Sequence, residues 1–428
     1  MGMEVRLIQA GNGDCILIRC GKSMRKVNIL IDSGISKDYF IKALNCIIEN
    51  KEKIDLLIFT HDDSDHIRGA RDLLKLLNRE KTALNRSNKC AVWKQKDSEV
   101  FKGLFENLTD DRIFFNYGGS GVDVQLSAKE ALELFENFKK VDIQRLGFLL
   151  SDAKGDLGVP YPNMMQLKWQ NMGNKILSEV IRQPNKKELE TIGEHLEIVI
   201  LSPDRQSLAD YICDAWKELG KRDIPLKSEK KEKKLNEWEK SIQYWMLHNA
   251  AQNHNLSKAN RSSIAFLLIY EEICGVFAGD AAPDTMIHAG KQYLTRKGIM
   301  QDYLEVDFIK LPHHGSSYNA STEFFQFFRT KNYFITTEGN EKNKHPGKIT
   351  LALIASALNE GETAHIYSSY SWWKNNKAFC KKELDTENWS SNGDLCELID
   401  AYGNKKYLHF HKTDTKPIWI SDNISVRR

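Results

Sequence analysis

The chain has 428 residues, 41% of them hydrophobic, and a formal net charge of +3 at pH 7. That length permits one large domain with a sizeable core, and the small charge excludes a strong overall attraction to nucleic acid. No apolar stretch approaches the roughly 18 residues of a membrane-spanning helix, so we expect no membrane segment. The eight cysteines form no C-x-x-C pair and the N-terminus begins as a strand rather than a signal peptide. We therefore expect a cytoplasmic protein with reduced thiols.

The first part of the chain ends in a cluster of potential metal ligands. The residue pattern of this first part predicts strands near 3–9, 14–20, 26–31 and 54–60, and helices near 37–50 and 67–78. The last of these strands leads directly into a loop that carries His61, Asp63, Asp65 and His66 within six residues. An apolar run that stops at such a cluster predicts a buried strand ending at an active site.

The spacing within this loop permits two adjacent ions. His61 and Asp63 can point to one side of a turn, while Asp65 and His66 point to the other. Imidazoles mixed with carboxylates suit Zn²⁺, Mn²⁺ or Fe. The alternative interpretation is a polar turn in which Asp65 caps a helix that begins near Ile67.

Two segments in the middle of the chain, at about 80–190 and 205–258, are expected to be insertions on the strength of the family resemblance given below. The first contains a glycine-rich loop at 118–121 and a predicted helix at 128–139. The segment 227–240 in the second is dense in Lys and Glu. Because the two charges alternate, the pattern favours a solvated helix with i,i+4 pairs over a basic arm for nucleic acid.

The second part of the chain again alternates strands and helices. Strands are predicted near 199–201, 263–270, 273–278, 305–311 and 331–336, and helices near 285–296, 321–329 and 347–358. The segment after 370 is rich in aromatic side chains, most of which we expect in the core: Trp372, Trp373, Trp389, Tyr407, Phe410 and Trp419.

The loop Thr60–Gly69 resembles the metal-binding loop of the metallo-β-lactamase superfamily, whose usual pattern is His-x-His-x-Asp-His. Asp63 stands in place of the second His, and this variant resembles the hydrolase domain of the ComEC-type DNA-uptake proteins. Other stretches resemble that branch in the same order: 10–18, 29–34, 260–263 leading to 278–280, 310–316, and His345-Pro346.

This resemblance covers roughly residues 3–80 and 195–370. It implies an α/β fold, a four-layer αββα sandwich spanning 1–428 as one domain with helical insertions. The segment of about 370–428 is then an aromatic-rich C-terminal extension. Only the soluble hydrolase part of the ComEC proteins is matched, without their membrane channel.

The resemblance also implies a centre of one or two Zn²⁺ or Mn²⁺ ions. Its expected ligands are His61 and Asp63 for the first ion, Asp65 and His66 for the second, Asp280 as the bridge and His314 for the second. The sequence leaves open which of the pair His313-His314 is the ligand, and we favour His314.

One ligand of the superfamily pattern is missing. Where its third motif usually has a His, the strand at 199–201 ends in Ser202-Pro203-Asp204, and His195 lies before the strand. The first ion therefore loses imidazole ligands. We expect it to be weakly held, with about one tightly bound ion and a readier acceptance of Mn²⁺.

Further roles follow from the same likeness. Asp63 or Asp65 would take a proton from the attacking water. His313, Ser316 and His345 are candidates to bind a substrate oxygen or to protonate a leaving group, although His345 fits a structural turn equally well.

Two buried-looking acids receive supporting roles. Asp32 is expected to orient a ligand histidine. Asp14 is expected to stabilise a turn rather than to take part in catalysis.

The function implied by the resemblance is a metal-dependent hydrolase. The ComEC-like branch points to a phosphodiesterase or nuclease acting on DNA, RNA or a smaller phosphodiester. A hydrolase of a lactone, thioester or cyclic nucleotide is the alternative, because one fold hosts many chemistries. A degenerate binding module within a larger assembly is a third interpretation, against which the complete set of ligand residues argues.

Overall fold

The computed structural model describes residues 2–21, 26–61, 63–70, 195–204, 256–339, 345–374 and 405–420, and short pieces between them. Most of the segments 80–190 and 205–258 lies outside the described residues. The predicted loop at 118–121, the predicted helix at 128–139 and all but Glu237 of the charged segment 227–240 lie outside them too.

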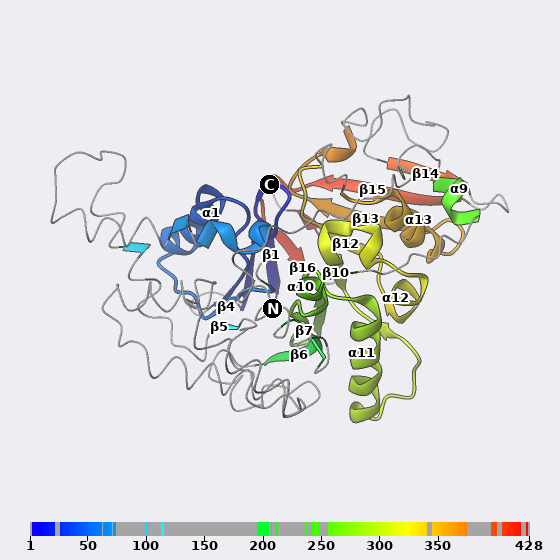
Figure 1. Cartoon of the computed structure of the whole chain (residues 1–428), viewed down its shortest axis with the longest axis horizontal. Coiled ribbons are helices and arrows are strands. Elements are labelled where there is room, and N and C mark those ends of the chain that lie inside the picture. The colour runs from blue at the N-terminus through cyan, green and yellow to red at the C-terminus, as the bar shows by residue number, and fades with distance from the viewer. Residues whose placement is uncertain are drawn as a thin grey trace, which may run out of the picture.

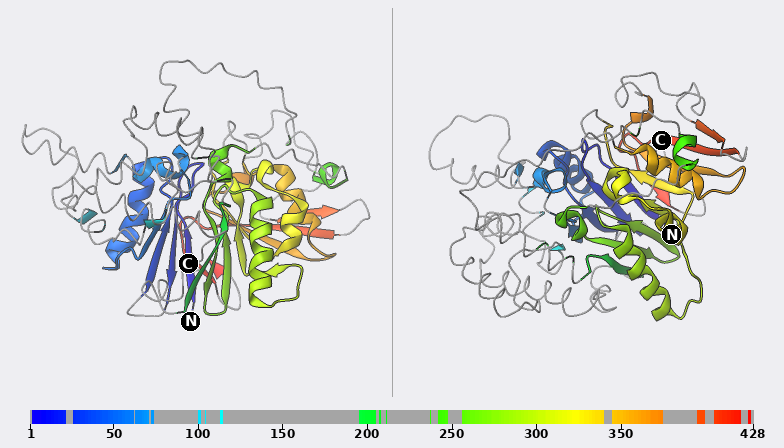
Figure 2. Two further views of the ribbon diagram at one scale, coloured as in Figure 1. Left: turned by 60° about the horizontal axis from the view of Figure 1, so that its bottom comes forward. Right: turned by 45° about the vertical axis from the view of Figure 1, so that its right-hand side comes forward.

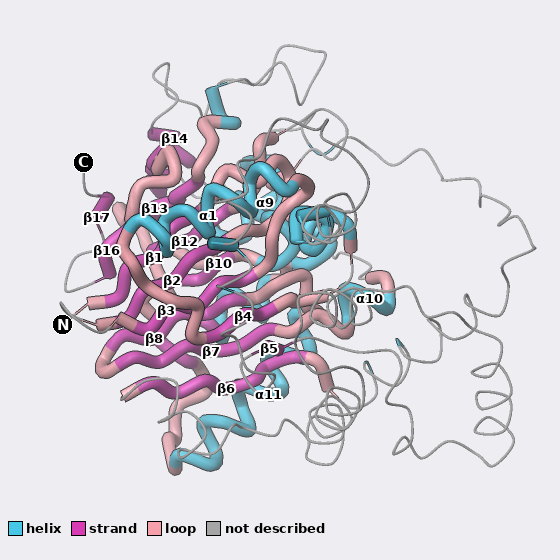
Figure 3. Tube along the Cα trace, turned by 90° about the vertical axis from the view of Figure 1, so that its left-hand side faces the viewer, coloured by secondary structure: helices cyan, strands magenta, loops and turns pink. Residues whose placement is uncertain are grey.

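The first sheet has seven strands in the order β17-β16-β1-β2-β3-β4-β5. Its strands are β1 (Met3–Leu7), β2 (Ile16–Cys20), β3 (Val27–Ile31), β4 (Leu56–Ile58), β5 (Ile113–Phe114), β16 (Ile418–Ile420) and β17 (Ser425–Val426). β1, β2 and β3 form an antiparallel meander, and β3 then pairs in parallel with β4. Figure 3 shows these strands side by side.

The second sheet has eight strands in the order β14-β15-β13-β12-β10-β8-β7-β6. Its strands are β6 (Leu196–Ser202), β7 (Ala265–Tyr270), β8 (Ile273–Phe277), β10 (Phe308–Lys310), β12 (Asn332–Ile335), β13 (Thr363–Ser368), β14 (Leu395–Ile399) and β15 (Lys405–Lys412). The run from β8 through β10, β12 and β13 to β15 is parallel throughout.

Side chains alternate between the two faces of the first sheet, one facing the second sheet and the other facing a helix. In β1, Met3, Val5 and Leu7 belong to the large core between the sheets. Leu17 of β2 and Leu57 of β4 face the other way, into a second core. Because successive strand residues point to opposite faces, the first sheet is buried on both sides.

Helices complete the four layers (Figures 1 and 2). Helix α1 (Lys37–Glu49), begun by the side chain of Ser36, packs Phe40, Leu44 and Ile47 into the second core. On the side of the second sheet lie α11 (Pro283–Lys297), α12 (Thr322–Phe327) and α13 (Lys348–Ser356). The fold is therefore the αββα sandwich that the sequence predicts.

The structure moves several predicted boundaries. The helix after the ligand loop begins at residue 64 rather than near Ile67, and its predicted end at 78 lies outside the described residues. The predicted helix at 321–329 ends at Phe327, because Phe328 and Arg329 form β11, which pairs with β9 (Leu304–Glu305). The predicted strand at 305–311 is correspondingly divided into β9 and β10.

The C-terminal segment is part of both sheets. β16 pairs with β1 in the first sheet, and β15 pairs with β13 in the second. Among its aromatic side chains Trp372, Trp373 and Phe410 are buried, whereas Trp389 lies outside the described residues. The segment therefore contributes strands and core.

The parallel pairing brings several loops to one edge. β3, β4, β8, β10 and β12 are each followed directly by a polar loop. Because the carboxyl ends of parallel strands meet at the same edge of a sheet, these loops gather there, where open α/β sheets usually bind ligands. None of the helices in the described part of the chain is long and apolar enough to cross a membrane.

Close packing of aromatic rings within the second sheet depends on Gly275. A Cβ atom at this position would lie 2.1 Å from the ring of Phe308, which stacks on Phe334 at 4.6 Å between centroids. We expect Gly275→Ala to lower the free energy of unfolding by about 1–3 kcal/mol because the buried ring has to move. Denaturant unfolding measures this, with the exposed Gln326→Ala as a control expected within about 0.5 kcal/mol of wild type. Equal stability of both variants would contradict the packing described.

Candidate metal centre

The ligand loop is held by a buried carboxylate at the end of the neighbouring strand. Asp32, which follows β3, accepts hydrogen bonds from the backbone N–H of Thr60 at 2.8 Å and from its hydroxyl at 2.7 Å. The adjacent Ser33 donates its hydroxyl to the carbonyl of His66 and accepts from the N–H of Ala70. Asp32 has a left-handed backbone with φ of 55°, which a non-glycine residue rarely adopts away from functional sites.

A glycine allows the loop to approach the first β-turn. A Cβ atom on Gly13 would lie 1.8 Å from the carbonyl oxygen of Asp65. The absence of a side chain at Gly13 therefore lets the 10–14 turn lie directly against the ligand loop, and brings Asp14 into the site.

Asp32 also fixes the ring of His66. Its Oδ2 lies 2.7 Å from His66 Nδ1, and because a carboxylate only accepts, Nδ1 carries the proton. The other ring nitrogen, Nε2, then faces Asp280 Oδ1 at 3.3 Å. This contact between Asp32 and His66 is the one expected of a residue that orients a ligand histidine.

Asp14 fixes His314 in the same manner. Asp14 Oδ1 lies 3.0 Å from His314 Nδ1, and the carboxylate also pairs with Lys310 and accepts from the hydroxyl of Thr336. All four side chains are buried. On the other side of the ring, His314 Nε2 faces Asp65 Oδ2 at 3.3 Å. Asp14 thus does more than stabilise a turn, contrary to the role expected from the sequence.

Both histidines of the pair face carboxylates because of an unusual backbone. His313, His314 and Gly315 have φ values of 48°, 55° and 81°, a left-handed run directly after β10. His313 Nδ1 lies 2.8 Å from Asn319 Oδ1. The amide group of Asn319 donates to the carbonyl of Asp280, so its oxygen accepts from His313.

With its Nδ1 occupied, His313 presents Nε2 to Asp280 Oδ2 at 3.5 Å. It therefore lies at the same carboxylate oxygen as His61, whose Nε2 is 3.6 Å away. The sequence favours His314 over His313 as the ligand of this pair, yet the structure places the Nε2 atom of both residues at a carboxylate.

His61 is oriented by hydroxyl groups. Its Nδ1 lies 3.1 Å from Thr60 Oγ1 and 3.3 Å from Ser263 Oγ. Thr60 donates its own proton to Asp32, so its oxygen accepts from His61. The remaining Nε2 lies between Asp63 Oδ2, at 3.5 Å, and Asp280 Oδ2.

The four rings therefore share one arrangement, with Nδ1 satisfied and Nε2 directed at a carboxylate. Among the residues that the structure describes, none forms a hydrogen bond with the buried atoms His61 Nε2, His66 Nε2, His314 Nε2 and Asp280 Oδ1. Buried polar atoms are normally paired. Ligand atoms of His61, His66 and Asp280 lie close enough to one another to share an ion, and so do those of Asp65, His66 and His314.

The charges in this cluster favour a cation. Burial lowers the pKa of His66, but the carboxylates of Asp280 and Asp32 outweigh burial and hold it well above its ordinary value. Burial also lowers the pKa of His314, but the neighbouring carboxylate of Asp14 outweighs burial, and the pKa rises to about 9. Burial raises the pKa of Asp280, but the surrounding imidazoles lower it well below its ordinary value. Positive charge among these groups is therefore strongly stabilised.

One side of the centre is open. The side chains of Asp63, Asp65 and His313 are 48%, 29% and 26% exposed, whereas those of His61 and His66 are 1% and 0% exposed. A substrate would approach from the side of the two loop carboxylates and His313.

His345 lies beside this open side. Its ring is 5.1 Å from that of His313 and 6.2 Å from that of His314, between centroids. Burial, together with the charges of these two histidines, lowers the pKa of His345 to about 3. Its ring is neutral at pH 7 and therefore suited to accept a hydrogen bond, rather than to protonate a leaving group.

The remaining residues singled out from the sequence make local contacts. Ser316 is buried and accepts from the N–H of Tyr318, capping the short helix η5 (Ser317–Asn319). Asp204 accepts from the N–H of Ser207 at 2.7 Å. His195 precedes β6, at the opposite end of that strand from Ser202.

Sequence reasoning missed the residues that support the rings: Thr60, Ser263, Lys310, Asn319 and Thr336. Thr60 and Lys310 lie within or beside the motifs quoted above, so their position was a usable signal. Asn319 and Thr336 lie beyond the histidine pair and carry no pattern that distinguishes them.

Comparison with known proteins supports this interpretation. Residues 8–79 match the family model of the metallo-beta-lactamase superfamily. The matched segment begins just after β1 and includes the ligand loop and the helix that begins at residue 64. The match does not separate the ComEC-like branch from others. Comparison with curated protein sequences gives no match.

Replacing one member of the buried pair of Asp14 and Lys310 should lower stability more than replacing both. We expect Asp14→Asn to destabilise the protein by about 3–5 kcal/mol, because it leaves the Lys310 ammonium uncompensated in the core. The double variant Asp14→Asn/Lys310→Met should recover most of the loss. Denaturant unfolding measures this, with the exposed Asp38→Asn as a control. A single variant as stable as this control would show that the pair is unimportant.

Metal uptake should release protons. At pH 7.5 metal-free His314, with a pKa of about 9, carries a proton that a bound ion displaces. Titration calorimetry in buffers of different ionisation enthalpy should therefore show a buffer-dependent heat that corresponds to net proton release. The His314→Gln variant should release fewer protons. A heat that is the same in every buffer would contradict the protonation described.

Proposed function

We propose that this protein is a hydrolase that uses two divalent cations held at the candidate metal centre. The observation that carries the proposal is the set of buried Nε2 atoms that have no hydrogen-bond partner and are directed at carboxylates. Two lone-pair groups that face each other at 3.3–3.6 Å repel unless a cation or a proton lies between them. Zn²⁺ and Mn²⁺ both accept this mixture of nitrogen and oxygen ligands.

Asp280 is proposed as the bridge. Its Oδ1 faces His66, and its Oδ2 faces both His61 and His313. On this assignment the first ion is held by His61, Asp63, His313 and Asp280 Oδ2. The second is held by Asp65, His66, His314 and Asp280 Oδ1.

His313 supplies the imidazole ligand that is missing from β6, which ends at Ser202. In the superfamily pattern a third-motif His completes the first site, and Ser202 stands there instead. The Nε2 of His313 lies at the oxygen of Asp280 that His61 also faces. The first site therefore has two imidazoles, which supports tighter binding of the first ion than the sequence pattern alone predicts.

Bound ions of this kind lower the pKa of water toward 7 and stabilise negative charge on a substrate oxygen. The chain's own groups complete the chemistry. Asp63 and Asp65 are the exposed carboxylates of the loop and are placed to accept a proton from the attacking water. His345, neutral at pH 7, is placed to accept a hydrogen bond from the substrate.

The substrate class is a phosphodiester, of DNA, RNA or a smaller molecule. Two adjacent sites that share one carboxylate suit an in-line displacement, in which attacking and leaving oxygens are both stabilised. The Asp63 variant of the loop, with its likeness to the ComEC-type hydrolase domain, supports the same class. The net charge of +3 means that any nucleic-acid binding depends on local groups rather than on the overall field.

Metal-stripped protein, supplied with Mn²⁺ or Zn²⁺, should cleave at least one member of a phosphodiester panel. That panel is labelled single-stranded DNA, duplex DNA, RNA and bis-p-nitrophenyl phosphate. The variant Asp65→Ala/His66→Ala should lose hydrolysis to background because it removes two ligands of the second site. Ser64→Ala is the matched control in the same loop, and it should retain activity because Ser64 is exposed.

The outcomes separate the site from the substrate. Wild-type hydrolysis by the double variant would refute the site. Metal-dependent cleavage of a lactone or thioester panel, with every phosphodiester left intact, would refute the substrate class alone.

A further inference from the structure

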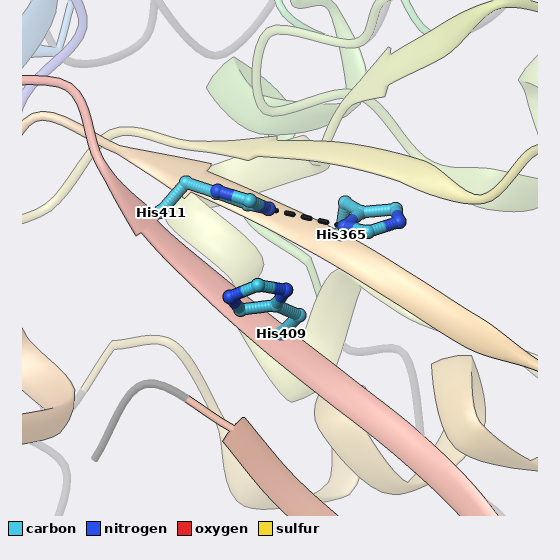
Figure 4. A group of neighbouring side chains, drawn as sticks. All are labelled: His365, His409 and His411. Atoms are coloured by element: carbon cyan, nitrogen blue, oxygen red, sulfur yellow. Dashed lines mark hydrogen bonds between the residues drawn. The ribbon is translucent and has the colours of Figure 1, made fainter. Parts of the chain in front are cut away.

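A second group of histidines lies outside the candidate metal centre, on the parallel strands β13 and β15. His365 is in direct register with His409, and His411 follows two residues later on β15. Residues two apart on a strand share a face, so all three imidazoles project from the same side of the sheet. Figure 4 shows the rings gathered across the two strands.

The three rings are close enough to share one ion. Their centroids are 5.7 Å (His365 to His409), 5.3 Å (His365 to His411) and 4.3 Å (His409 to His411) apart. One ring nitrogen of each residue lies within 4.8 Å of the other two. Tetrahedral zinc with Zn–N distances of about 2.0–2.1 Å separates two ligand nitrogens by about 3.3 Å, and His365 Nδ1 lies 3.0 Å from His411 Nε2.

The surroundings hold these rings in place while leaving them accessible. The alternate residues Ile366, Leu408 and Phe410 are buried on the other face of the sheet, which anchors both strands. Tyr367 stacks on His411 at 4.5 Å between centroids, with 10° between the planes. All three histidines are partly exposed, so an ion from solution can reach them.

The groups around His365 keep its ring neutral, so that it can bind a cation. Burial, followed by His409 and Lys331, lowers the pKa of His365, so its ring is neutral near pH 7 and offers a lone pair. The ammonium of Lys331 forms an ion pair with Glu362 at 2.8 Å, which offsets its repulsion of a cation.

We propose that His365, His409 and His411 form a second cation site that binds Zn²⁺ through three imidazole ligands. Imidazole is a preferred ligand of zinc, and three histidines leave a fourth position for water or another ligand. Hard cations such as Mg²⁺ and Ca²⁺ prefer oxygen ligands and are excluded from this site. The ion would link β15, from the C-terminal part of the chain, to its parallel neighbour β13 in the second sheet.

Zinc stoichiometry of the full-length protein tests this proposal. In equilibrium dialysis with Zn²⁺ alone, the variant His409→Gln/His411→Gln should bind one zinc ion fewer per chain than wild type. His288→Gln is the matched control, because His288 is an exposed histidine on α11 and its loss should leave the stoichiometry unchanged. Circular dichroism should show that both variants keep the wild-type spectrum.

A second measurement needs no variant. Diethyl pyrocarbonate modifies accessible imidazoles, and mass spectrometry of the wild-type protein reports each peptide. Zn²⁺ should protect the peptide that contains His409 and His411, while His288 is modified equally with and without zinc. Unchanged stoichiometry in the double variant, or modification of this peptide regardless of zinc, would overturn the proposal.

Discussion

The structure of the candidate centre depends on one constraint, the fixed orientation of four imidazole rings. Asp32, Asp14, Asn319 and Thr60 each occupy an Nδ1 atom, so each Nε2 is left to face a carboxylate. An imidazole held in this way cannot rotate to relieve the repulsion between lone pairs. Positive charge between these groups is therefore stabilised. Protons supply it in the metal-free centre, and the two ions proposed above would take their place.

The αββα architecture provides the rigidity that this constraint needs. The acid that orients His66 follows β3, the ligand loop follows β4, Asp280 follows β8 and the histidine pair follows β10. Parallel pairing of β3 with β4 and of β8 with β10 fixes the ends of these strands relative to one another, and β3, β4 and β10 are buried along their whole length. The left-handed backbone at Asp32, His313 and His314 is a local cost that the surrounding packing sustains.

The sequence was most informative where local pattern and motif coincide. The loop from His61 to His66, the Asp280 turn and the histidine pair were predictable because each follows an apolar strand directly. The function of His313 and the pairing of Asp14 with Lys310 were not, since they depend on contacts between residues far apart in the chain. The C-terminal strands were not predicted for the same reason. β15 pairs with β13, and His409 lies beside His365, only in the folded sheet.

The most direct test of the two-ion centre is anomalous diffraction from crystals of the wild-type protein grown with Zn²⁺ or Mn²⁺. We predict one peak beside Asp280 Oδ2, within bonding distance of the Nε2 atoms of His61 and His313. A second peak is predicted beside Asp280 Oδ1, bonded to the Nε2 atoms of His66 and His314. The absence of anomalous density between these nitrogen atoms and Asp280, in crystals that contain the metal elsewhere, would contradict the account.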